Sequence, residues 1–273
     1  MGLWLRDDWR AESRNGAAAL LLHGFTGDPK EMLPLAEGLA AAGYGVRVPV
    51  LPGHGGAPHE LMGLGWRDWL DGAAAALAEL RRDHDRIFLG GFSMGGALSV
   101  LLARDGGQQL AGLLLLATPT TLGDDWRLGL LPLLKHVMPW FKPLEKADFS
   151  APEVRRQVAE FDPGLDLDDP GVHAALRSQV RLPVGALEQL TLLLAAMRPA
   201  LPLVSAPALI QQGALDDTAR PFCAVEIARR LGGPAELRWW ERSGHMLLQG
   251  PESAAIVAQA VAFCEERAAA PGA

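Results

Sequence analysis

Residues 86–104 decide the fold, and they read Arg-Ile-Phe-Leu-Gly-Gly-Phe-Ser-Met-Gly-Gly-Ala-Leu-Ser-Val-Leu-Leu-Ala-Arg. The apolar run 87–89 precedes the pattern Gly-x-Ser-x-Gly at 91–95, after which apolar residues recur at helical spacing. A strand, a sharp turn and a helix are therefore predicted. Small residues two positions either side of Ser93 let strand and helix crowd at a strained turn, which is typical of a nucleophile elbow. The alternative is a glycine-rich turn with an ordinary serine.

Around this stretch, apolar strands alternate with amphipathic helices. Strands are predicted at Ala17–Leu22, Tyr44–Val50, Arg86–Gly90, Leu110–Ala117, Ala208–Gly213 and Leu237–Trp240. Helices are predicted from Pro29 to about Ala42, over 66–80, after Ser93, over Pro221–Leu231, and from Pro251 with Ile256, Ala260, Phe263 and Cys264 on one face. This β–α alternation predicts an α/β fold, with a mostly parallel sheet and helices on both faces.

The first of these helices has a well-marked start. Asp28 is an N-cap acid, Pro29 occupies the first helical position, and Glu31 lies three residues after the cap. This is the pattern of a capping box, in which the glutamate returns to the N-cap amide.

The alternation breaks between Pro119 and Pro202, where prolines separate short apolar helical segments and no clear strand is found. We expect residues 1–118 and 203–273 to form the core domain and 119–202 a helical cap inserted after the sixth strand. The segments 128–134 and 187–194 are too apolar to stand in water. A lid over the carboxyl ends of the strands is the natural place for them, and the alternative is a helical subdomain with no role near the site.

Composition excludes several classes of protein. The 273 residues are 49% hydrophobic and 21% charged, which fits one sizeable domain or a core domain with an insertion. A net charge of −7 without a basic run argues against nucleic-acid binding. Met1–Asp8 lacks the features of a signal peptide, and no stretch approaches eighteen charge-free apolar residues, so a cytoplasmic protein without stable membrane insertion is expected.

Cofactor motifs are missing as well. The chain contains no H-E-x-x-H, no cysteine cluster, no G-x-x-x-x-G-K-[ST] and no G-x-G-x-x-G opening a nucleotide fold. Neither a metal nor another cofactor is therefore expected. Cys223 and Cys264 fall in amphipathic helical segments, which favours buried free thiols over a disulfide.

Elimination then selects partners for Ser93. In enzymes built around such an elbow the chain order is serine, acid, histidine, with acid and histidine on loops after late strands. Of seven histidines only His245 lies downstream of Asp216, between the last strand and the terminal helix. Asp216 would hold the His245 imidazole in the tautomer that accepts the Ser93 proton. The adjacent Asp217 could take the same place, and would otherwise be solvated or cap a helix.

Acyl transfer also needs donors for a developing oxyanion. The backbone N–H of Met94, just after the nucleophile, supplies one, and the loop after the first strong strand supplies another. Phe25 fits best there, since Gly24 lets the loop approach the elbow. His23, at a strand end before a glycine, is interpreted as a structural hydrogen-bonding residue and not as a second base.

Five motifs together carry a family resemblance: Leu22-His23-Gly24-Phe25-Thr26-Gly27, Pro52-Gly53-His54-Gly55, Gly91-Phe92-Ser93-Met94-Gly95-Gly96, Gly213-x-x-Asp216 with Pro221 beyond it, and Ser243-Gly244-His245. Over about residues 15–267 the chain resembles the bacterial carboxylesterase and monoacylglycerol-lipase branch of the α/β-hydrolase superfamily. The resemblance implies Ser93 as nucleophile, Asp216 as acid, His245 as base, and the Phe25 and Met94 amides as oxyanion hole. It also implies cleavage of short- to medium-chain esters or monoacylglycerols without a cofactor, and a cap that shapes the acyl pocket. The sequence departs from the family in the insertion.

Two functions from different classes follow. The first is a serine esterase that acts on a small-molecule ester through an acyl-enzyme on Ser93. The second is a ligand-binding protein on the same fold that makes little or no use of the triad. An intact Ser, Asp and His favour the enzyme, because a binder has no chemical need for all three. Thioesterase, acyltransferase and perhydrolase activities would use the same residues.

Overall fold

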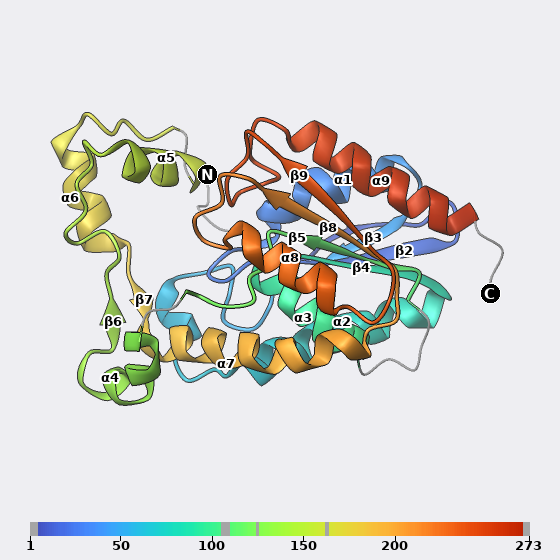
Figure 1. Cartoon of the computed structure of the whole chain (residues 1–273), viewed down its shortest axis with the longest axis horizontal. Coiled ribbons are helices and arrows are strands. Elements are labelled where there is room, and N and C mark those ends of the chain that lie inside the picture. Colours follow the sequence, from blue (N-terminus) through green and yellow to red (C-terminus); the bar gives the residue numbers. More distant parts are fainter. Residues whose placement is uncertain (1–4, 105–109, 124–125, 162–163, 270–273) are drawn as a thin grey trace.

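A seven-stranded sheet forms the centre of the molecule (Figure 1), in the order β1-β3-β2-β4-β5-β8-β9. The computed structural model describes residues 5–104, 110–123, 126–161 and 164–269, so the start of the predicted N-terminal segment, residues 1–4, lies outside them. The strands are β1 (Trp9–Ala11), β2 (Ala17–Leu22), β3 (Gly45–Val48), β4 (Arg86–Phe92), β5 (Gly112–Leu116), β8 (Ala208–Gly213) and β9 (Ala235–Trp240). β1 runs antiparallel to β3, and every other pairing in this seven-stranded sheet is parallel.

Helices cover both faces of this sheet (Figure 1). One layer holds α1 (Leu33–Ala41) and α9 (Ser253–Ala269), and the other holds α2 (Trp66–Asp83), α3 (Met94–Arg104), α7 (Val184–Ala200) and α8 (Pro221–Arg230). Each layer closes its own cluster of buried apolar side chains against the sheet. β2 and β5 are buried at every position, which is why their sequences are continuous apolar runs without alternation.

The predicted strands all form. Three other features of the core differ from what the sequence predicted. The short edge strand β1 was missed, because only three residues of mixed polarity give no periodic signal. Among the described residues the insertion follows β5, which is the fifth strand and not a sixth, because β1 alone comes before β2 there. The predicted helix from Pro29 divides into a 3-10 turn, η1 (Pro29–Met32), and α1, with Pro34 in the first turn of α1.

The insertion contains more structure than the sequence indicated. It comprises η3 (Trp126–Leu130), α4 (Leu131–Val137), β6 (Trp140–Phe141), α5 (Pro152–Phe161), α6 (Pro170–Gln179), β7 (Leu182–Pro183), α7 and η4 (Leu201–Leu203), and outside it η2 spans Pro58–Leu61. β6 and β7 form an antiparallel pair, contrary to the expectation of no strand. Two residues each are too few to show a period-two pattern.

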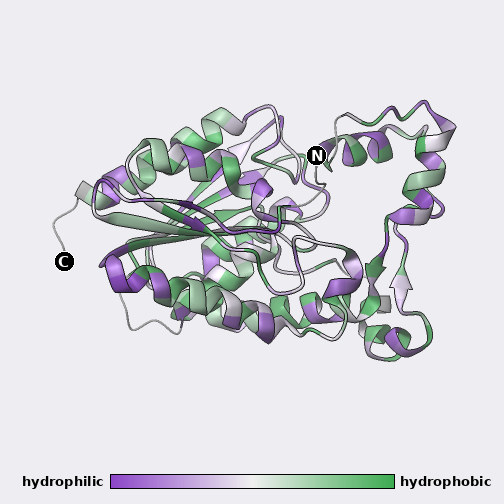
Figure 2. Ribbon diagram, turned by 180° about the vertical axis from the view of Figure 1, so that it is seen from behind, coloured by the Kyte–Doolittle hydropathy of each residue, from purple (hydrophilic) through white to green (hydrophobic). Residues whose placement is uncertain are grey.

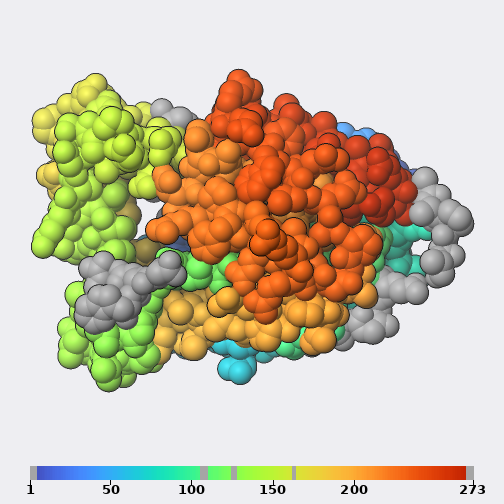
Figure 3. All heavy atoms as spheres, viewed as in Figure 1, coloured from blue at the N-terminus to red at the C-terminus, as the bar shows by residue number. Residues whose placement is uncertain are grey.

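Residues 142–161 and 164–181, which we call the arm, project from the body beyond the β6–β7 pair (Figures 1 and 3). The arm has its own small cluster of buried side chains around Phe149, Val158 and Leu167. Its helices alternate polar and apolar faces (Figure 2). In the space-filling view an opening separates part of the arm from the body (Figure 3).

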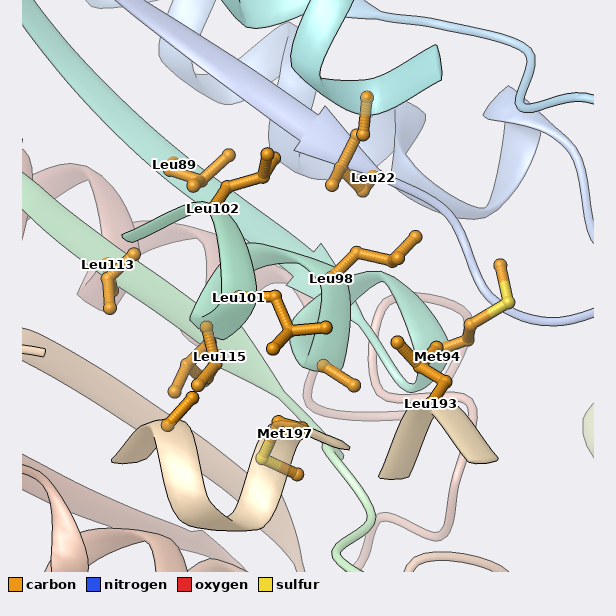
Figure 4. Close-up of a cluster of buried hydrophobic side chains, with 14 of the residues drawn as sticks. Leu22, Leu89, Met94, Leu98, Leu101, Leu102, Leu113, Leu115, Leu193 and Met197 are labelled. Atoms are coloured by element: carbon orange, nitrogen blue, oxygen red, sulfur yellow. The ribbon is translucent and has the colours of Figure 1, made fainter. Parts of the chain in front are cut away.

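Helix α7 packs onto the core layer, so the apolar segment 187–194 folds down onto the body, and its expected role as a lid stays a prediction. Leu193 and Met197 lie against Met94 and Leu101 of the elbow helix α3 (Figure 4), and all four are fully or almost fully buried. The predicted boundary at residue 202 therefore falls after a helix that packs with the core layer. Among the described residues one helical stretch, Val184–Leu203, is long and apolar enough to cross a membrane, and 50% of its most apolar window is buried inside the protein.

The other apolar segment, 128–134, is only partly covered. Leu131 is 8% exposed and α4 packs against α7. Leu133, however, is 71% exposed. Helical spacing directs only one side of such a short helix toward its neighbour, so the expectation that the whole segment folds onto the body was wrong for Leu133.

Candidate active site

Ser93 lies on the turn between β4 and α3, in a backbone conformation that few serines adopt. Its φ angle is 52°, in the left-handed region. A Cβ on Gly91 would overlap the backbone at Gly95, and a Cβ on Gly95 would overlap the Leu22 carbonyl. The two glycines of the pattern are thus required by close backbone approach. Ser93 remains partly exposed although its neighbours on both sides are buried.

The structure brings Ser93, His245 and Asp216 together from three separate loops. Ser93 Oγ lies 3.2 Å from His245 Nε2, and His245 Nδ1 lies 2.9 Å from Asp216 Oδ2. Asp216 follows β8 and His245 follows β9, at the carboxyl edge of the parallel sheet. The imidazole is therefore arranged to accept the serine proton on one nitrogen while its other N–H donates to the carboxylate.

The protein fixes the Asp216 carboxylate on both oxygens. Oδ1 accepts the amides of Thr218 and Ala219, each at 2.8 Å. Oδ2 accepts the Gln212 side-chain amide at 3.0 Å besides the His245 ring. Asp216 is 2% exposed, so these donors replace the water that a buried carboxylate loses.

Asp217 points elsewhere. Its side chain is 53% exposed and forms an ion pair with Arg156 of α5, at 2.7 Å. Of the two adjacent acids, Asp216 is the one in contact with His245, as the sequence reading favoured. Asp217 is neither simply solvated nor a helix cap.

The two predicted oxyanion donors are backbone amides at neighbouring strand ends. Leu22 of β2 pairs in register with Gly91 of β4, so the loop with Phe25 and the turn with Ser93 and Met94 leave the sheet side by side. In the part of the chain that the structure describes, neither the Phe25 nor the Met94 amide donates a hydrogen bond. Both remain available to a ligand oxygen.

His23 has the structural place that the sequence indicated. It is fully buried, its Nε2 accepts the Leu51 amide at 3.2 Å, and its Nδ1 lies 2.9 Å from the Gly24 carbonyl. Burial lowers the pKa of His23 to about 4. Burial, together with the neighbouring His23, lowers the pKa of His54 to about 3. The rings of His54 and Trp69 pack against the ring of Phe25 in this loop.

Sequence reasoning missed Gln212, which donates to Asp216, and it also missed a residue that reaches the triad from the arm. Glu160 of α5, in the arm, accepts the backbone N–H of His245 on Oε2 at 2.9 Å. Gly244 leaves room for this carboxylate, since a Cβ there would overlap it. Arg156 lies one turn earlier, so the same helix also reaches the Asp216 loop through Asp217. The sequence shows that Arg156 and Glu160 lie four residues apart, but it does not show that they contact Asp217 and His245.

A groove of about 260 Å³ lies where α5 meets these loops. Arg156 and Glu160 line it on the arm side, and Leu215, Gly244 and Met246 are among the residues that line it on the body side. Ser93 is not among the lining residues, so the groove lies beside the triad and not over the serine.

Within residues 5–104, 110–123, 126–161 and 164–269, no group of three or more His, Cys, Asp or Glu side chains is placed to hold a metal ion. Cys223 and Cys264 are buried free thiols, as predicted. Burial raises the pKa of the Cys264 thiol, which keeps it protonated and unreactive.

An elbow serine hydrogen-bonded through histidine to a buried aspartate, on a mostly parallel sheet with helices on both faces, defines a serine hydrolase of the α/β-hydrolase fold. The chain belongs to the Hydrolase_4 family, described as serine aminopeptidase S33, which matches residues 13–252.

Proteins named as a lipase and an esterase are similar to this chain. A thermostable monoacylglycerol lipase of Bacillus sp. (strain H-257) is 41% identical over 92 residues, which are 33% of this chain and 37% of that protein. A carboxylesterase of Bacillus subtilis (strain 168) is 23% identical over 252 residues, 91% of this chain and 92% of that protein.

Solved structures share the fold over nearly the whole chain. A structure from work on the metagenome-derived lipolytic enzymes LipS and LipT is 27% identical, with a TM-score of 0.79, and the match covers 96% of this chain and 98% of that one. A monoacylglycerol lipase of Paleococcus ferrophilus has a TM-score of 0.73 at 15% identity, covering 95% and 98% of the two chains, and this likeness concerns the fold alone.

Proposed function

We propose that this protein hydrolyses carboxylic esters of short- to medium-chain acids, or monoacylglycerols, through an acyl-enzyme on Ser93. The observation that carries the proposal is the continuous hydrogen-bond chain from Ser93 Oγ through His245 to Asp216. The lipolytic relatives support an ester as substrate.

In the proposed reaction Ser93 Oγ attacks the ester carbonyl carbon while its proton passes to His245 Nε2. The oxyanion that forms would accept hydrogen bonds from the Phe25 and Met94 amides. His245 then gives its proton to the alkoxide oxygen as the C–O bond breaks, and the alcohol leaves. Water then loses a proton to His245 and attacks the acyl carbon. His245 returns that proton to Ser93 Oγ as the bond between Oγ and the acyl carbon breaks, and the carboxylic acid is released.

We propose that the arm acts as the cap that shapes the substrate pocket. Its helix α5 contacts both loops that carry the acid and the base, through Arg156 and Glu160. Bound acyl chain contributes binding energy of about 0.8 kcal/mol per buried methylene, so a cap that covers the chain would set the preferred length. The division into core and cap at residues 118 and 203 and the cytoplasmic location remain predictions.

The test combines labelling with kinetics. A fluorophosphonate probe is expected to modify Ser93 at one equivalent and abolish hydrolysis of p-nitrophenyl esters from acetate to octanoate, and Ser93→Ala should be inert to both. Label on another serine, or none, would reject the mechanism and favour the binding-protein alternative.

Parallel assays define the substrate class. Amino-acid p-nitroanilides test the peptidase activity in the family's description, and acyl thioesters test thioesterase activity. If the protein hydrolysed the p-nitroanilides or the thioesters faster than every ester, the assignment as an esterase would be wrong. The catalytic role of the triad would not be affected.

A further inference from the structure

Glu31 does not cap its helix. Its carboxylate turns back into the loop 23–27 that follows β2, where Oε2 accepts the Gly24 amide at 2.7 Å. The N-cap of η1 is formed by Asp28 alone, whose side chain accepts the Lys30 amide. The predicted capping box is therefore incomplete: the Glu31 carboxylate accepts the Gly24 amide and not the amide of the N-cap residue Asp28.

The loop is built to receive this carboxyl group. A Cβ on Gly27 would overlap the Glu31 carboxyl atoms, so the group occupies the space that a side chain at position 27 would fill. A Cβ on Gly24 would lie 3.1 Å from Glu31 Oε2. The carboxyl group thus lies within the curve of the loop, while the Glu31 residue as a whole is partly exposed.

The same loop presents the Phe25 amide in a strained turn. Gly27 donates its amide to the Gly24 carbonyl at 3.2 Å, which closes a four-residue turn. Thr26, in the third position of this turn, has a φ of 62°. That position favours glycine, and a β-branched residue there costs about 1–3 kcal/mol, so other contacts must hold the conformation.

We propose that Glu31 is a positioning residue for the oxyanion-binding amide of Phe25: by accepting the Gly24 amide it fixes the strained turn and leaves the next amide free. This inference rests on the proposed function. Its consequence is that Glu31 affects the transition state, in which the oxyanion exists, more than substrate binding.

The charge of Glu31 is compatible with this role. Burial, with a further contribution from the Asp28 carboxylate, raises the pKa of Glu31 to about 8, although the Gly24 hydrogen bond acts in the opposite direction. A largely protonated carboxyl group still accepts a hydrogen bond through its carbonyl oxygen, and it does not repel a neighbouring oxyanion.

The experiment compares Glu31→Met with Glu31→Gln, because the two side chains are similar in size and only glutamine keeps an acceptor oxygen. Glu37→Ala, on the exposed side of α1, is the control. Kinetics with p-nitrophenyl butyrate give kcat and KM, and inhibition by butylboronic acid, which forms a tetrahedral adduct with the serine oxygen, reports on the oxyanion site.

Glu31→Met is expected to lower kcat about tenfold to hundredfold with KM within about threefold, less than the full loss of an oxyanion donor, and to weaken the boronate by a similar factor. Glu31→Gln should stay within about threefold of the wild type. Melting temperatures identify unfolded variants, and Glu31→Ala replaces Glu31→Met if that variant does not fold.

The inference would be overturned if the folded Glu31→Met variant, or Glu31→Ala in its place, kept the wild-type kcat without a side-chain acceptor oxygen. Equal losses of kcat in Glu31→Met and Glu31→Gln would also overturn it. A loss confined to KM would do the same. All variants are compared with the wild type, whose ester hydrolysis must depend on Ser93. If the wild type lacks that hydrolysis, the proposed function fails, and this result is distinct from a failure of the Glu31 inference.

Discussion

Replacing Asp216 by asparagine tests the site where its geometry is most fully determined. The carboxylate receives the Thr218 and Ala219 amides on one oxygen, and the Gln212 amide and the His245 N–H on the other. Gln212 Nε2 also donates to the Ala219 carbonyl at 2.9 Å, so it cannot turn to offer its oxygen without losing that bond. An asparagine at 216 therefore places an NH₂ group against donors in either orientation.

Each of the two orientations of the asparagine side chain is unfavourable, and the free energy lost in each sets the expected loss of activity. With the NH₂ group toward His245, the imidazole must carry its proton on Nε2 and cannot accept the Ser93 proton, a change that costs about 10⁴ in kcat, or about 5.5 kcal/mol, in the serine-protease example. With the NH₂ group toward Thr218 and Ala219, two hydrogen bonds to a charged acceptor are lost, at about 1.5–3 kcal/mol each. We expect Asp216→Asn to lose several orders of magnitude in kcat.

The matched control is Asp217→Asn, one residue away. It weakens only an exposed ion pair with Arg156, worth about 0–1 kcal/mol, so activity should remain within about tenfold of the wild type. Both variants are assayed for kcat and KM on p-nitrophenyl butyrate, and their melting temperatures are compared. The reverse order of losses would assign the role to Asp217, and two mild losses would mean that another group orients His245.

Three further predictions concern packing, pH and the arm. Leu193→Ala should lower the free energy of unfolding by about 2–5 kcal/mol in urea titrations, whereas Leu192→Ala, at a side chain that is 46% exposed, should change it by less than about 0.5 kcal/mol; similar values would contradict the core position of α7. His54 is neutral in the folded protein and gains a proton on unfolding below its ordinary pKa of 6.5, so stability is lost as pH falls from 6.5 toward about 3. His54→Gln should make that pH dependence shallower by about 1.4 kcal/mol per pH unit, as measured by unfolding at several pH values, and an unchanged slope would refute the argument. Glu160→Ala should speed limited proteolysis within residues 142–181 because the arm loses its bond to the His245 loop, while the exposed Glu153→Ala should not; equal rates would show that this contact does not hold the arm.

Local patterns were enough to predict much of the fold. Continuous apolar runs located the buried parallel strands, and the glycines at 91 and 95 located the elbow, because close backbone approach leaves no room for a side chain. Chain order placed Ser93, Asp216 and His245 on loops at one edge of the sheet, since parallel strands all end there. The residue types and their order are therefore enough to identify the candidate site.

The tertiary structure decided which partner each of several side chains meets. Helical spacing showed that α7 has an apolar face, but not that α3 covers it. The capping-box pattern identified Glu31 as a hydrogen-bond acceptor, yet the donor that it meets is the Gly24 amide. Glu160 and the His245 amide lie 85 residues apart in the chain, and Arg156 and Asp217 lie 61 apart. Periodicity and spacing record the conformation of one segment, whereas contacts between segments depend on how the packed layers are placed in space, and that placement is a property of the whole chain.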